Sequence, residues 1–315
     1  MIGIDVGGAN LKVADETGAH IHYCPLWEKA PITEILLPYA ELNRNAAVVM
    51  SGELADCFMD KMQGISFIVD AVKNAFPNAR FYGTDGTFHD RAVPGLAAAN
   101  WLASADVLRT RHPDAILLDI GSTTSDIIPL NRFSQLKGLT DTKRLQKGYL
   151  LYTGMLRTSI PTLIRSVNLN GIPTPVSTEY FAASADAHLV LGHIGPEQYT
   201  CDTPDHKEKI VAASLRRLAR VVCADLEEIG EEGATDIARQ FWAVQRARVC
   251  DQVKRVSRET GSRKIIIAGT GASLFARELG GMDLTEELGN FADALPAFAV
   301  RELAAGRIAA SEPDL

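Results

Sequence analysis

The chain has 315 residues, 46% hydrophobic and 23% charged, which excludes a disordered or fibrous protein and suffices for two hydrophobic cores joined by a cleft. The formal net charge of −7 argues against the basic surface that nucleic-acid binding requires, so we expect no nucleic-acid partner. The N-terminus lacks signal-peptide features and no stretch approaches the roughly 18 apolar residues of a membrane helix, so we expect a cytoplasmic protein without a membrane partner.

The first predicted elements form a short hairpin. An apolar strand, Ile2–Val6, is followed by a glycine-rich turn and a second strand around Leu11–Ala14. Such a turn lets successive backbone N–H groups bind an anion, while Asp5 at the strand end can hold hydrated Mg²⁺. The alternative is an ordinary turn without a ligand. If the turn binds phosphate, its candidate ligands are Gly7, Gly8, Asn10 and the point charge of Lys12.

The rest of a first domain, residues 1–110, is predicted to contain further strands and helices. Glu53 and Asp56 follow the next strand, where capping of a helix competes with a catalytic role. Asp85 lies just past another strand, as either a turn former or a base. The pattern predicts strands near 46–50 and 79–83 and helices near 60–76 and 92–107.

A second segment, residues 115–130, repeats the plan of the first hairpin. At a constant offset of 114 residues, Asp5 aligns with Asp119 and Lys12 with Asp126. Two such turns that face each other would clamp a diphosphate from both sides. Asp126 is a candidate for holding a metal or a water, and a salt bridge to Lys12 is the alternative. The candidate phosphate ligands of the second turn are Gly121, Ser122, Thr123 and Thr124.

The second predicted domain, residues 111–315, continues with an irregular stretch, 131–206. Within it, Gly154 and Arg157 are further binding candidates, because a guanidinium suits a diphosphate or a carboxylate; an ordinary surface position is the alternative for Arg157. The histidines lack the spacing of a metal site. Helices are predicted over residues 207–228, 235–259 and 291–308.

A third glycine-containing turn follows an apolar strand that begins at Lys264. Gly269 and Gly271 allow close backbone approach, and the N-terminus of the helix behind them favours negative charge. The turn lies too late in the chain, and lacks the third glycine, for a dinucleotide-binding fold.

The order of the three turns resembles that of the actin-like ATPase superfamily, which includes sugar kinases, Hsp70-type chaperones and actin. This resemblance implies an α/β protein with an actin-like ATPase (ribonuclease H-like) fold, in which two related domains enclose a cleft. In that superfamily the first two turns hold phosphates and the last borders adenosine. The resemblance therefore adds Gly269 and Gly271 to the candidate binding residues.

Four segments narrow the match further: 50–58, 98–103, 118–129 and 152–158. Over about residues 1–280 the chain is similar to the hydantoinase/oxoprolinase-related family linked to tetrahydromethanopterin C1 metabolism. This family includes a transferase of methanofuran biosynthesis, which joins an aminomethylfuran-methyl diphosphate to γ-glutamyltyramine and releases pyrophosphate. Asn10 and Lys12 stand in place of a threonine-type phosphate loop, a departure from ATP-hydrolysing relatives.

The resemblance implies such a transferase, with a furanylmethyl diphosphate and γ-glutamyltyramine as its small-molecule substrates. It would use Mg²⁺ and would not require ATP. One alternative is an ATP-dependent hydantoinase/oxoprolinase-like or kinase-like enzyme, and another is a non-catalytic nucleotide-binding regulator of C1 metabolism. A homo-oligomer is compatible with all three. The candidate metal ligands are Asp5 and Asp119, and the catalytic candidates are Asp5, Lys12, Asp85, Asp119 and Asp126.

Overall fold

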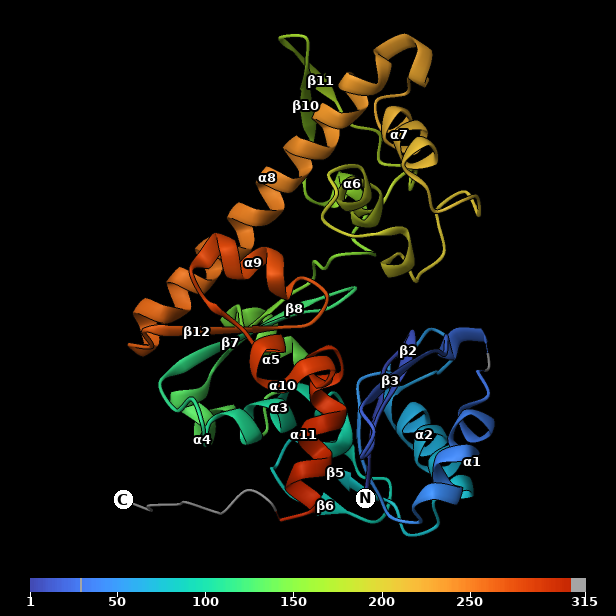
Figure 1. Ribbon diagram of the computed structural model, residues 1–315, viewed down its shortest axis with the longest axis vertical. Coiled ribbons are helices and arrows are strands. Elements are labelled where there is room, and N and C mark those ends of the chain that lie inside the picture. Colours follow the sequence, from blue (N-terminus) through green and yellow to red (C-terminus); the bar gives the residue numbers. More distant parts are fainter. Residues whose placement is uncertain (29, 307–315) are drawn as a thin grey trace.

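Two mixed β-sheets form the body of the protein in the computed structural model, which describes residues 1–28 and 30–306 (Figure 1). In the first sheet the strands lie in the order β3 (Ala19–Tyr23), β2 (Asn10–Ala14), β1 (Ile2–Val6), β4 (Ala46–Met50), β5 (Arg80–Tyr82), β6 (Phe88–His89). In the second sheet the order is β13 (Met282–Asp283), β12 (Lys264–Ala268), β7 (Ala115–Ile120), β8 (Ser125–Pro129), β9 (Leu150–Leu151).

The two sheets share one plan. In both, the first strand, β1 or β7, pairs antiparallel with its hairpin partner and parallel with a much later strand, β4 or β12. Next to the hairpin partner, a third strand, β3 or β9, continues the sheet in antiparallel pairing. At the other edge, a further strand, β5 or β13, pairs parallel with β4 or β12. This shared order, 3-2-1-4-5, is the ribonuclease H-like order, so the expected actin-like fold with two related domains is confirmed.

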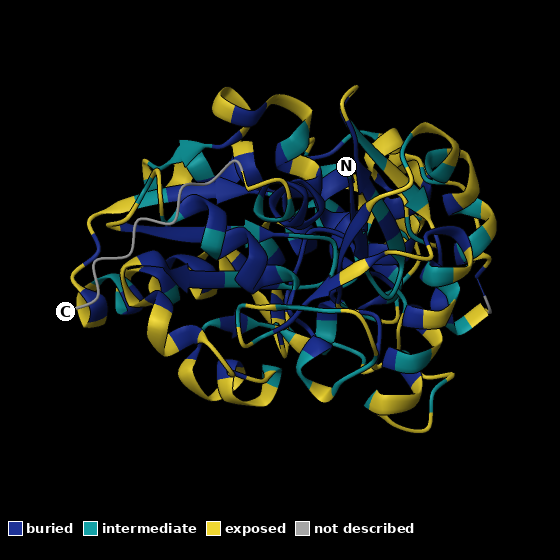
Figure 2. Cartoon of the chain, turned by 90° about the horizontal axis from the view of Figure 1, so that it is seen from below, coloured by how far each residue is buried: buried dark blue, intermediate teal, exposed yellow. Residues whose placement is uncertain are grey.

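Helices cover both faces of each sheet. One face of the first sheet packs on α1 (Ile32–Leu42) and α2 (Lys61–Ala75), and one face of the second packs on α8 (Leu226–Thr260) and α9 (Ala272–Leu279). The inner faces of both sheets share a core with α3 (Asn100–Leu108) and α11 (Leu295–Ala304). Because the central strands are covered on both sides, they are continuous apolar runs, and they are dark in Figure 2.

The last described helix, α11, packs on β1 and β4 of the first sheet. A Cβ on Gly3 would lie 2.0 Å from the carbonyl oxygen of Ala297, so only glycine allows this helix to approach the strand so closely. The sequence-based division into 1–110 and 111–315 assigns this helix to the second domain, whereas its most extensive contacts are with α3, β1 and β4 of the first. The predicted helix 291–308 extends past residue 306 and there lies outside the described residues.

A third, smaller lobe occupies the upper part of Figure 1. It contains the hairpin β10 (Ser166–Leu169) and β11 (Ile172–Pro175), α6 (Ser184–Val190), α7 (Val211–Arg220) and the first half of α8, which share a separate apolar core. The stretch 131–206, expected to be irregular, therefore contributes regular elements. Helix α8 is interrupted near its start, where Gly230 has a φ of 71°.

Short elements connect the larger ones. Predicted helix 92–107 begins only at Asn100, because Ala98 adopts a φ of 47°, which a helix does not allow. None of the described helices has both the length and the apolar character needed to cross a membrane. The short helices are η1 (Leu26–Glu28), η2 (Pro94–Leu96), η3 (Leu130–Arg132), α4 (Phe133–Leu136), α5 (Asp141–Lys147), η4 (Ile160–Thr162), η5 (Pro196–Gln198), α10 (Thr285–Leu288) and η6 (Gly289–Ala294).

Candidate active site

The two hairpins have turns of the same kind. In the first, the Gly7 N–H donates to the carbonyl of Asn10 at 2.9 Å. In the second, the Gly121 N–H donates to the carbonyl of Thr124 at 3.0 Å. The glycine-rich segments therefore adopt one backbone arrangement at two places in the chain.

Strand register extends this equivalence to the charged residues. Asp5 pairs with Lys12 across β1 and β2, and Asp119 pairs with Asp126 across β7 and β8. The offset of 114 residues found in the sequence thus relates equivalent positions in the two sheets.

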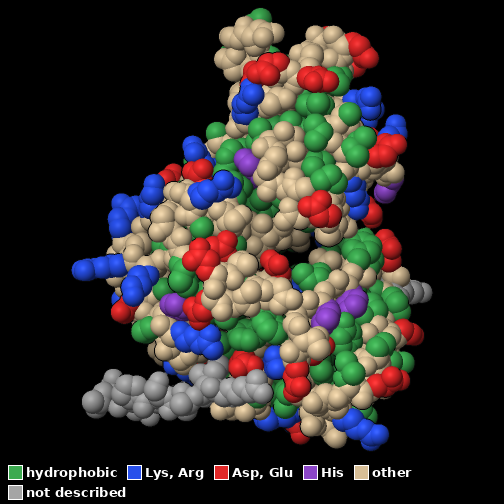
Figure 3. Space-filling view, in the orientation of Figure 1, with side chains coloured by type: hydrophobic (Ala, Val, Ile, Leu, Met, Phe, Trp, Pro, Cys, Tyr) green, Lys and Arg blue, Asp and Glu red, His purple; other side chains and the backbone are tan. Residues whose placement is uncertain are grey.

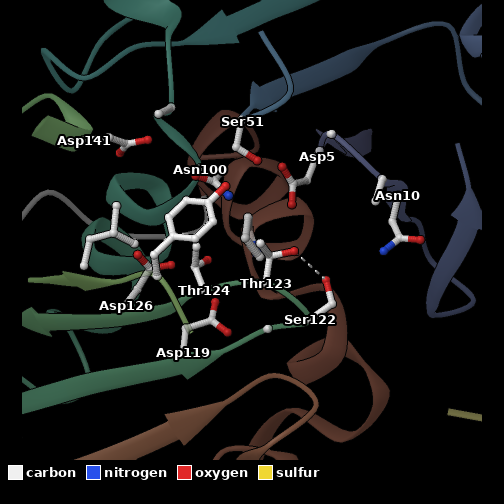
Figure 4. A pocket seen from close by; sticks show the side chains of 18 of the residues that line it. Asp5, Asn10, Ser51, Asn100, Asp119, Ser122, Thr123, Thr124, Asp126 and Asp141 are labelled. Atoms are coloured by element: carbon white, nitrogen blue, oxygen red, sulfur yellow. Dashed lines mark hydrogen bonds between the residues drawn. The ribbon is translucent and has the colours of Figure 1, made fainter. Parts of the chain in front are cut away.

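The turns face each other across a cleft of about 280 Å³. In Figure 4, Asp5 and Asn10 enter it from strands of the first domain, and Asp119 enters from β7 and Ser122 from the turn after β7 in the second. Figure 3 shows the surface hollowed between the two lobes at this level. The structure brings together these predicted residues: Asp5, Gly7, Gly8, Asn10, Lys12, Asp119, Gly121, Ser122, Thr123, Thr124, Asp126 and Arg157.

Other lining residues were missed by the sequence analysis. Ala98 and Asn100 lie in a segment that carries the family resemblance, which is the only sequence signal for them. Asp141 and Arg144 come from α5, which has no recognisable motif. The cleft is completed by Ala9, Ser51, Leu150, Tyr152 and Pro296.

Asp5 is a buried carboxylate at the floor of the cleft. Its Oδ1 is inaccessible to solvent and has no hydrogen-bond partner among the described residues. Burial raises the pKa of Asp5 to about 6, although the positive charge of Lys12 opposes this shift. A carboxylate with an unused buried oxygen is suited to a cation or a proton that arrives with a ligand.

Asp119 occupies the equivalent position in the second hairpin. Burial raises the pKa of Asp119 to about 7; Lys12 opposes the shift, and the negative charges of Asp126, Asp5 and Asp293 add to it. A carboxyl group with a pKa near neutrality can accept and release a proton at physiological pH.

Asp126 is held by an arginine from α5. The Arg144 guanidinium donates to Oδ1 of Asp126 and, at 2.9 Å, to Asp141, and it stacks over Trp101 at 4.2 Å. Burial raises the pKa of Asp126, and Arg144 acts in the opposite direction. The ion pair with Arg144 thus fixes the carboxylate of Asp126.

The salt bridge considered between Lys12 and Asp126 is not formed. The Lys12 ammonium donates instead to the carbonyl of Asp293 at 2.8 Å, while Asp126 pairs with Arg144. The prediction overlooked Arg144 because it lies 18 residues from Asp126 in the chain. Lys12 therefore remains a cleft cation without a carboxylate in a salt bridge to it among the described residues.

The segment that follows β9, residues 153–157, packs against the second turn and is hydrogen-bonded to it. The N–H groups of Leu156 and Arg157 donate to the carbonyl of Ser122 at 2.9 and 3.0 Å, which fixes the position of that carbonyl. A Cβ on Gly154 would lie 2.6 Å from the Thr123 nitrogen. Gly154 thus packs under the phosphate turn and does not line the cleft.

A buried polar network fixes this supporting segment to α8. The Gln245 side chain donates to Thr153 Oγ1 at 3.0 Å and to the Gly154 carbonyl at 2.9 Å. His188 Nε2 lies 2.9 Å from Gln245 Oε1, and burial, assisted by His193, lowers the pKa of His188 to about 3. His188 is therefore neutral at physiological pH, and the network links the third lobe to the second turn.

The late glycine turn packs on β7, and neither Gly269 nor Gly271 is among the residues that line the cleft. Gly269 has a φ of 82°, and a Cβ there would lie 2.5 Å from the Ile120 carbonyl and 2.6 Å from Asp119 Oδ1. A Cβ on Gly271 would lie 2.9 Å from Ile120 Cγ2. Close packing against the strand that carries Asp119 explains both glycines.

Asp85 lies in a turn and is not among the residues that line the cleft, so of its two expected roles the structure shows that of a turn former. It accepts hydrogen bonds from the Thr87 N–H at 3.0 Å and the Thr87 hydroxyl at 2.9 Å, and pairs with His89 at 3.0 Å. Glu53 is buried outside the cleft lining, and Asp60, rather than Glu53 or Asp56, caps α2.

Comparison with known families identifies the chain's relatives. The family model described as hydantoinase/oxoprolinase matches residues 44–293. The chain belongs to the hydantoinase/oxoprolinase family. A relative from Methanocaldococcus jannaschii is 35% identical over 96% of this chain and 97% of its own length, and its name is (4-{4-[2-(γ-L-glutamylamino)ethyl]phenoxymethyl}furan-2-yl)methanamine synthase. A relative from Methanococcus vannielii with the same name is 36% identical over 55% of this chain and 78% of its own length.

Solved structures show more distant similarity. Nucleotide-free acetone carboxylase has a TM-score of 0.44 at 11% identity, covering 92% of this chain and 51% of its own. The activator of 2-hydroxyisocaproyl-CoA dehydratase from Clostridium difficile, with bound ADPNP, has a TM-score of 0.41 at 10% identity, covering 100% and 99%.

The donor set of this family member suits a magnesium ion that arrives with a phosphorylated ligand. Within residues 1–28 and 30–306, no three histidine, cysteine or acidic side chains are grouped to hold a metal by themselves. Mg²⁺ at phosphate sites needs only one or two carboxylates, because phosphate oxygens and waters complete its octahedral shell. Asp5, with its unpartnered Oδ1, and Asp119 meet that requirement.

Proposed function

We propose that this chain is a transferase of methanofuran biosynthesis that joins a furanylmethyl diphosphate to the phenol oxygen of γ-glutamyltyramine and releases pyrophosphate. The observation that carries the proposal is the convergence of two matching turns on one cleft. The name of the two relatives supports the substrates, since it describes an aryl ether between a furanylmethyl carbon and a phenol that bears a γ-glutamylaminoethyl tail.

The two turns would hold the diphosphate between them. Their backbone N–H groups, the Ser122 and Thr123 hydroxyls and the Lys12 ammonium line the same cleft and would stabilise the charge that develops on the departing pyrophosphate. Of the two carboxylates, Asp5, with its unpartnered Oδ1, is the one that would hold Mg²⁺, which when bound would neutralise part of that charge. The furan ring is electron-rich and tolerates positive character at the carbon that loses the diphosphate.

The bond changes balance without another reactant. The phenol oxygen forms a bond to the furanylmethyl carbon, the carbon–oxygen bond to the diphosphate breaks with its electron pair, and the phenol loses its proton. We assign Asp119 as the acceptor of that proton, because Asp126 is tied to Arg144 and Asp5 is the first candidate for the cation. Its pKa of about 7 suits the role.

The direct test measures pyrophosphate release from the furanylmethyl diphosphate and γ-glutamyltyramine, with and without ATP. We expect ether product and one equivalent of pyrophosphate without any nucleotide. We also expect pyrophosphate with Mg²⁺ to raise the melting temperature more than ATP with Mg²⁺ at equal concentration, because a ligand that binds the folded state stabilises it. Product formation that strictly requires ATP and releases stoichiometric ADP would contradict the proposal and favour an oxoprolinase-like enzyme.

A further inference from the structure

Each of the two turns is hydrogen-bonded to a second segment, and one of these segments ends at Arg157, which lines the cleft. We call residues 23–27, residues 153–157 and Asp202 the mouth segments, because contacts with Arg157 and Tyr23 join them beside the cleft. In the first domain, the N–H of Cys24 donates to the carbonyl of Ala9 and the N–H of Leu26 to that of Gly8, both at 2.9 Å. In the second domain, the segment that ends at Arg157 is bonded in the same way to Ser122. The two turns thus position these mouth segments as well as the diphosphate site.

The mouth segments meet across the cleft. The Arg157 guanidinium lies over the Trp27 indole, 4.9 Å from the ring centroid. The Tyr23 hydroxyl donates to a carboxylate oxygen of Asp202 at 3.4 Å. Trp27 and Tyr23 belong to the first domain, while Arg157 and Asp202 belong to the second, so this platform is assembled from both sides.

Arg157 is available to a ligand. It is only half-buried and lines the cleft, and none of the salt bridges within the described residues involves it. Stacking on an indole orients the plane of a guanidinium and leaves the N–H groups at its edge free to bind a carboxylate through two hydrogen bonds. Trp27 is therefore placed to orient Arg157.

We propose that Arg157, Trp27 and Asp202 form the subsite for the amino-acid end of the acceptor, an inference that rests on the proposed function. The acceptor's phenol must point toward the diphosphate turns, so its γ-glutamyl tail extends toward the mouth. That tail ends in an α-carboxylate and an α-ammonium. Arg157 matches the carboxylate, and the exposed carboxylate of Asp202 matches the ammonium.

This subsite gives the enzyme a means of selecting its acceptor. Tyramine has the same phenol but lacks the glutamyl group, so it would reach the reacting carbon without engaging Arg157 and Asp202. Binding at the mouth would also hold the two domains together through one ligand, because Trp27 and Arg157 come from opposite sides of the cleft.

The experiment compares γ-glutamyltyramine with tyramine on the full chain. Calorimetric titration in the presence of pyrophosphate and Mg²⁺ gives the two affinities, and steady-state kinetics gives KM for each substrate. We expect wild type to prefer γ-glutamyltyramine, and Arg157→Ala and Asp202→Asn each to reduce that preference by about tenfold or more. KM for the furanylmethyl diphosphate should not change.

Substitutions at the stacking residue test its orienting role. Trp27→Leu should raise KM for γ-glutamyltyramine less than Arg157→Ala does, and Trp27→Phe should restore most of the loss, since it keeps an aromatic face. Arg165→Ala, at an exposed arginine outside the cleft lining, is the matched control and should behave as wild type. Melting curves identify any variant that does not fold.

Two results would overturn the subsite. One is equal binding of tyramine and γ-glutamyltyramine by wild type. The other is an Arg157→Ala variant whose KM rises for the diphosphate and not for the acceptor, which would make Arg157 a phosphate ligand. If wild type forms no ether product, the proposed function fails, and the titration of the two acceptors still decides whether the subsite exists.

Discussion

The two hairpins at the cleft have one backbone plan and opposite charges at one equivalent position. Lys12 lies opposite Asp5 in the strand register of the first sheet, whereas Asp126 lies opposite Asp119 in the second. In the first hairpin the positive charge is part of the hairpin itself. In the second it is supplied by Arg144 from α5, and this arginine forms salt bridges with Asp126 and Asp141.

This difference divides the cleft chemically. Lys12 forms its described hydrogen bond only to a backbone carbonyl, so its charge remains available to an anion. On the other side, Asp119 and Asp126 make the second hairpin acidic, and Arg144 offsets only one of them directly. A diphosphate would therefore find its cation on the first hairpin and its proton acceptor on the second.

The largest expected effect tests the acidic side. Asp119→Asn removes the proposed proton acceptor while keeping the shape of the side chain, so we expect kcat to fall by about 10³-fold. The loss belongs to the transition state, so the folded protein should persist, as judged by its melting temperature. Pyrophosphate release measures the activity. A parallel loss of thermal stability and activity would instead indicate that Asp119 has only a structural role.

The second expected effect concerns stability at the paired residue. Asp126→Asn leaves the buried Arg144 with Asp141 as its remaining carboxylate, and we expect a loss of about 3 kcal/mol in the free energy of unfolding. Burial raises the pKa of Asp126, which alone would favour a neutral side chain. Arginine, however, keeps its charge in proteins, so the buried guanidinium, left with a single exposed carboxylate, decides the outcome.

Urea denaturation measures this loss, with Asp141→Asn as the matched control. The Asp141 side chain is 40% exposed and pairs with the same guanidinium, so its replacement should cost less than about 1 kcal/mol. Equal losses for the two variants would show that Arg144 does not distinguish the buried carboxylate from the exposed one.

The repeated hairpins could be predicted from sequence because their determinants are local. A strand, an aspartate and a glycine turn lie within about ten residues, and the second copy at a fixed offset gave the equivalence of Asp5 and Asp119. The actin-like fold with two related domains followed from the resemblance. Local signals also explain why the sequence left two roles open for Asp85, since a turn aspartate and a catalytic one share the same sequence pattern.

The surroundings of the hairpins could not be predicted, because they depend on contacts between distant segments. Arg144 reaches Asp126 only after α5 folds back on β8, and Gln245 reaches Gly154 across 91 residues. The segment around Gly269 has the composition of an anion-binding turn, but what requires a glycine there is the close approach of its backbone to Ile120 of β7. The hydrophobic periodicity likewise did not predict the separate core of the third lobe.

The smallest expected effect concerns pH and compares Asp5 with the paired carboxylate Asp126. Burial raises the pKa of Asp5 to about 6, above its value in the unfolded chain. A carboxyl group of this kind adds stability while it is protonated and loses that contribution as the pH rises through its folded-state pKa. Between pH 5.5 and pH 8 in the absence of Mg²⁺, this loss amounts to about 1 kcal/mol.

Asp5→Asn removes this contribution, together with the smaller rise that the charge of Asp5 causes in the pKa of Asp119. The free energy of unfolding of Asp5→Asn minus that of wild type should therefore rise by about 1 kcal/mol from pH 5.5 to pH 8. Mg²⁺ with pyrophosphate should reduce the difference at pH 8, since a cation at Oδ1 stabilises the charged form of Asp5. A difference that stays constant with pH would mean that Asp5 is already charged in the folded protein at pH 5.5, as expected of a paired carboxylate. The two hairpins would then be alike in their charge balance.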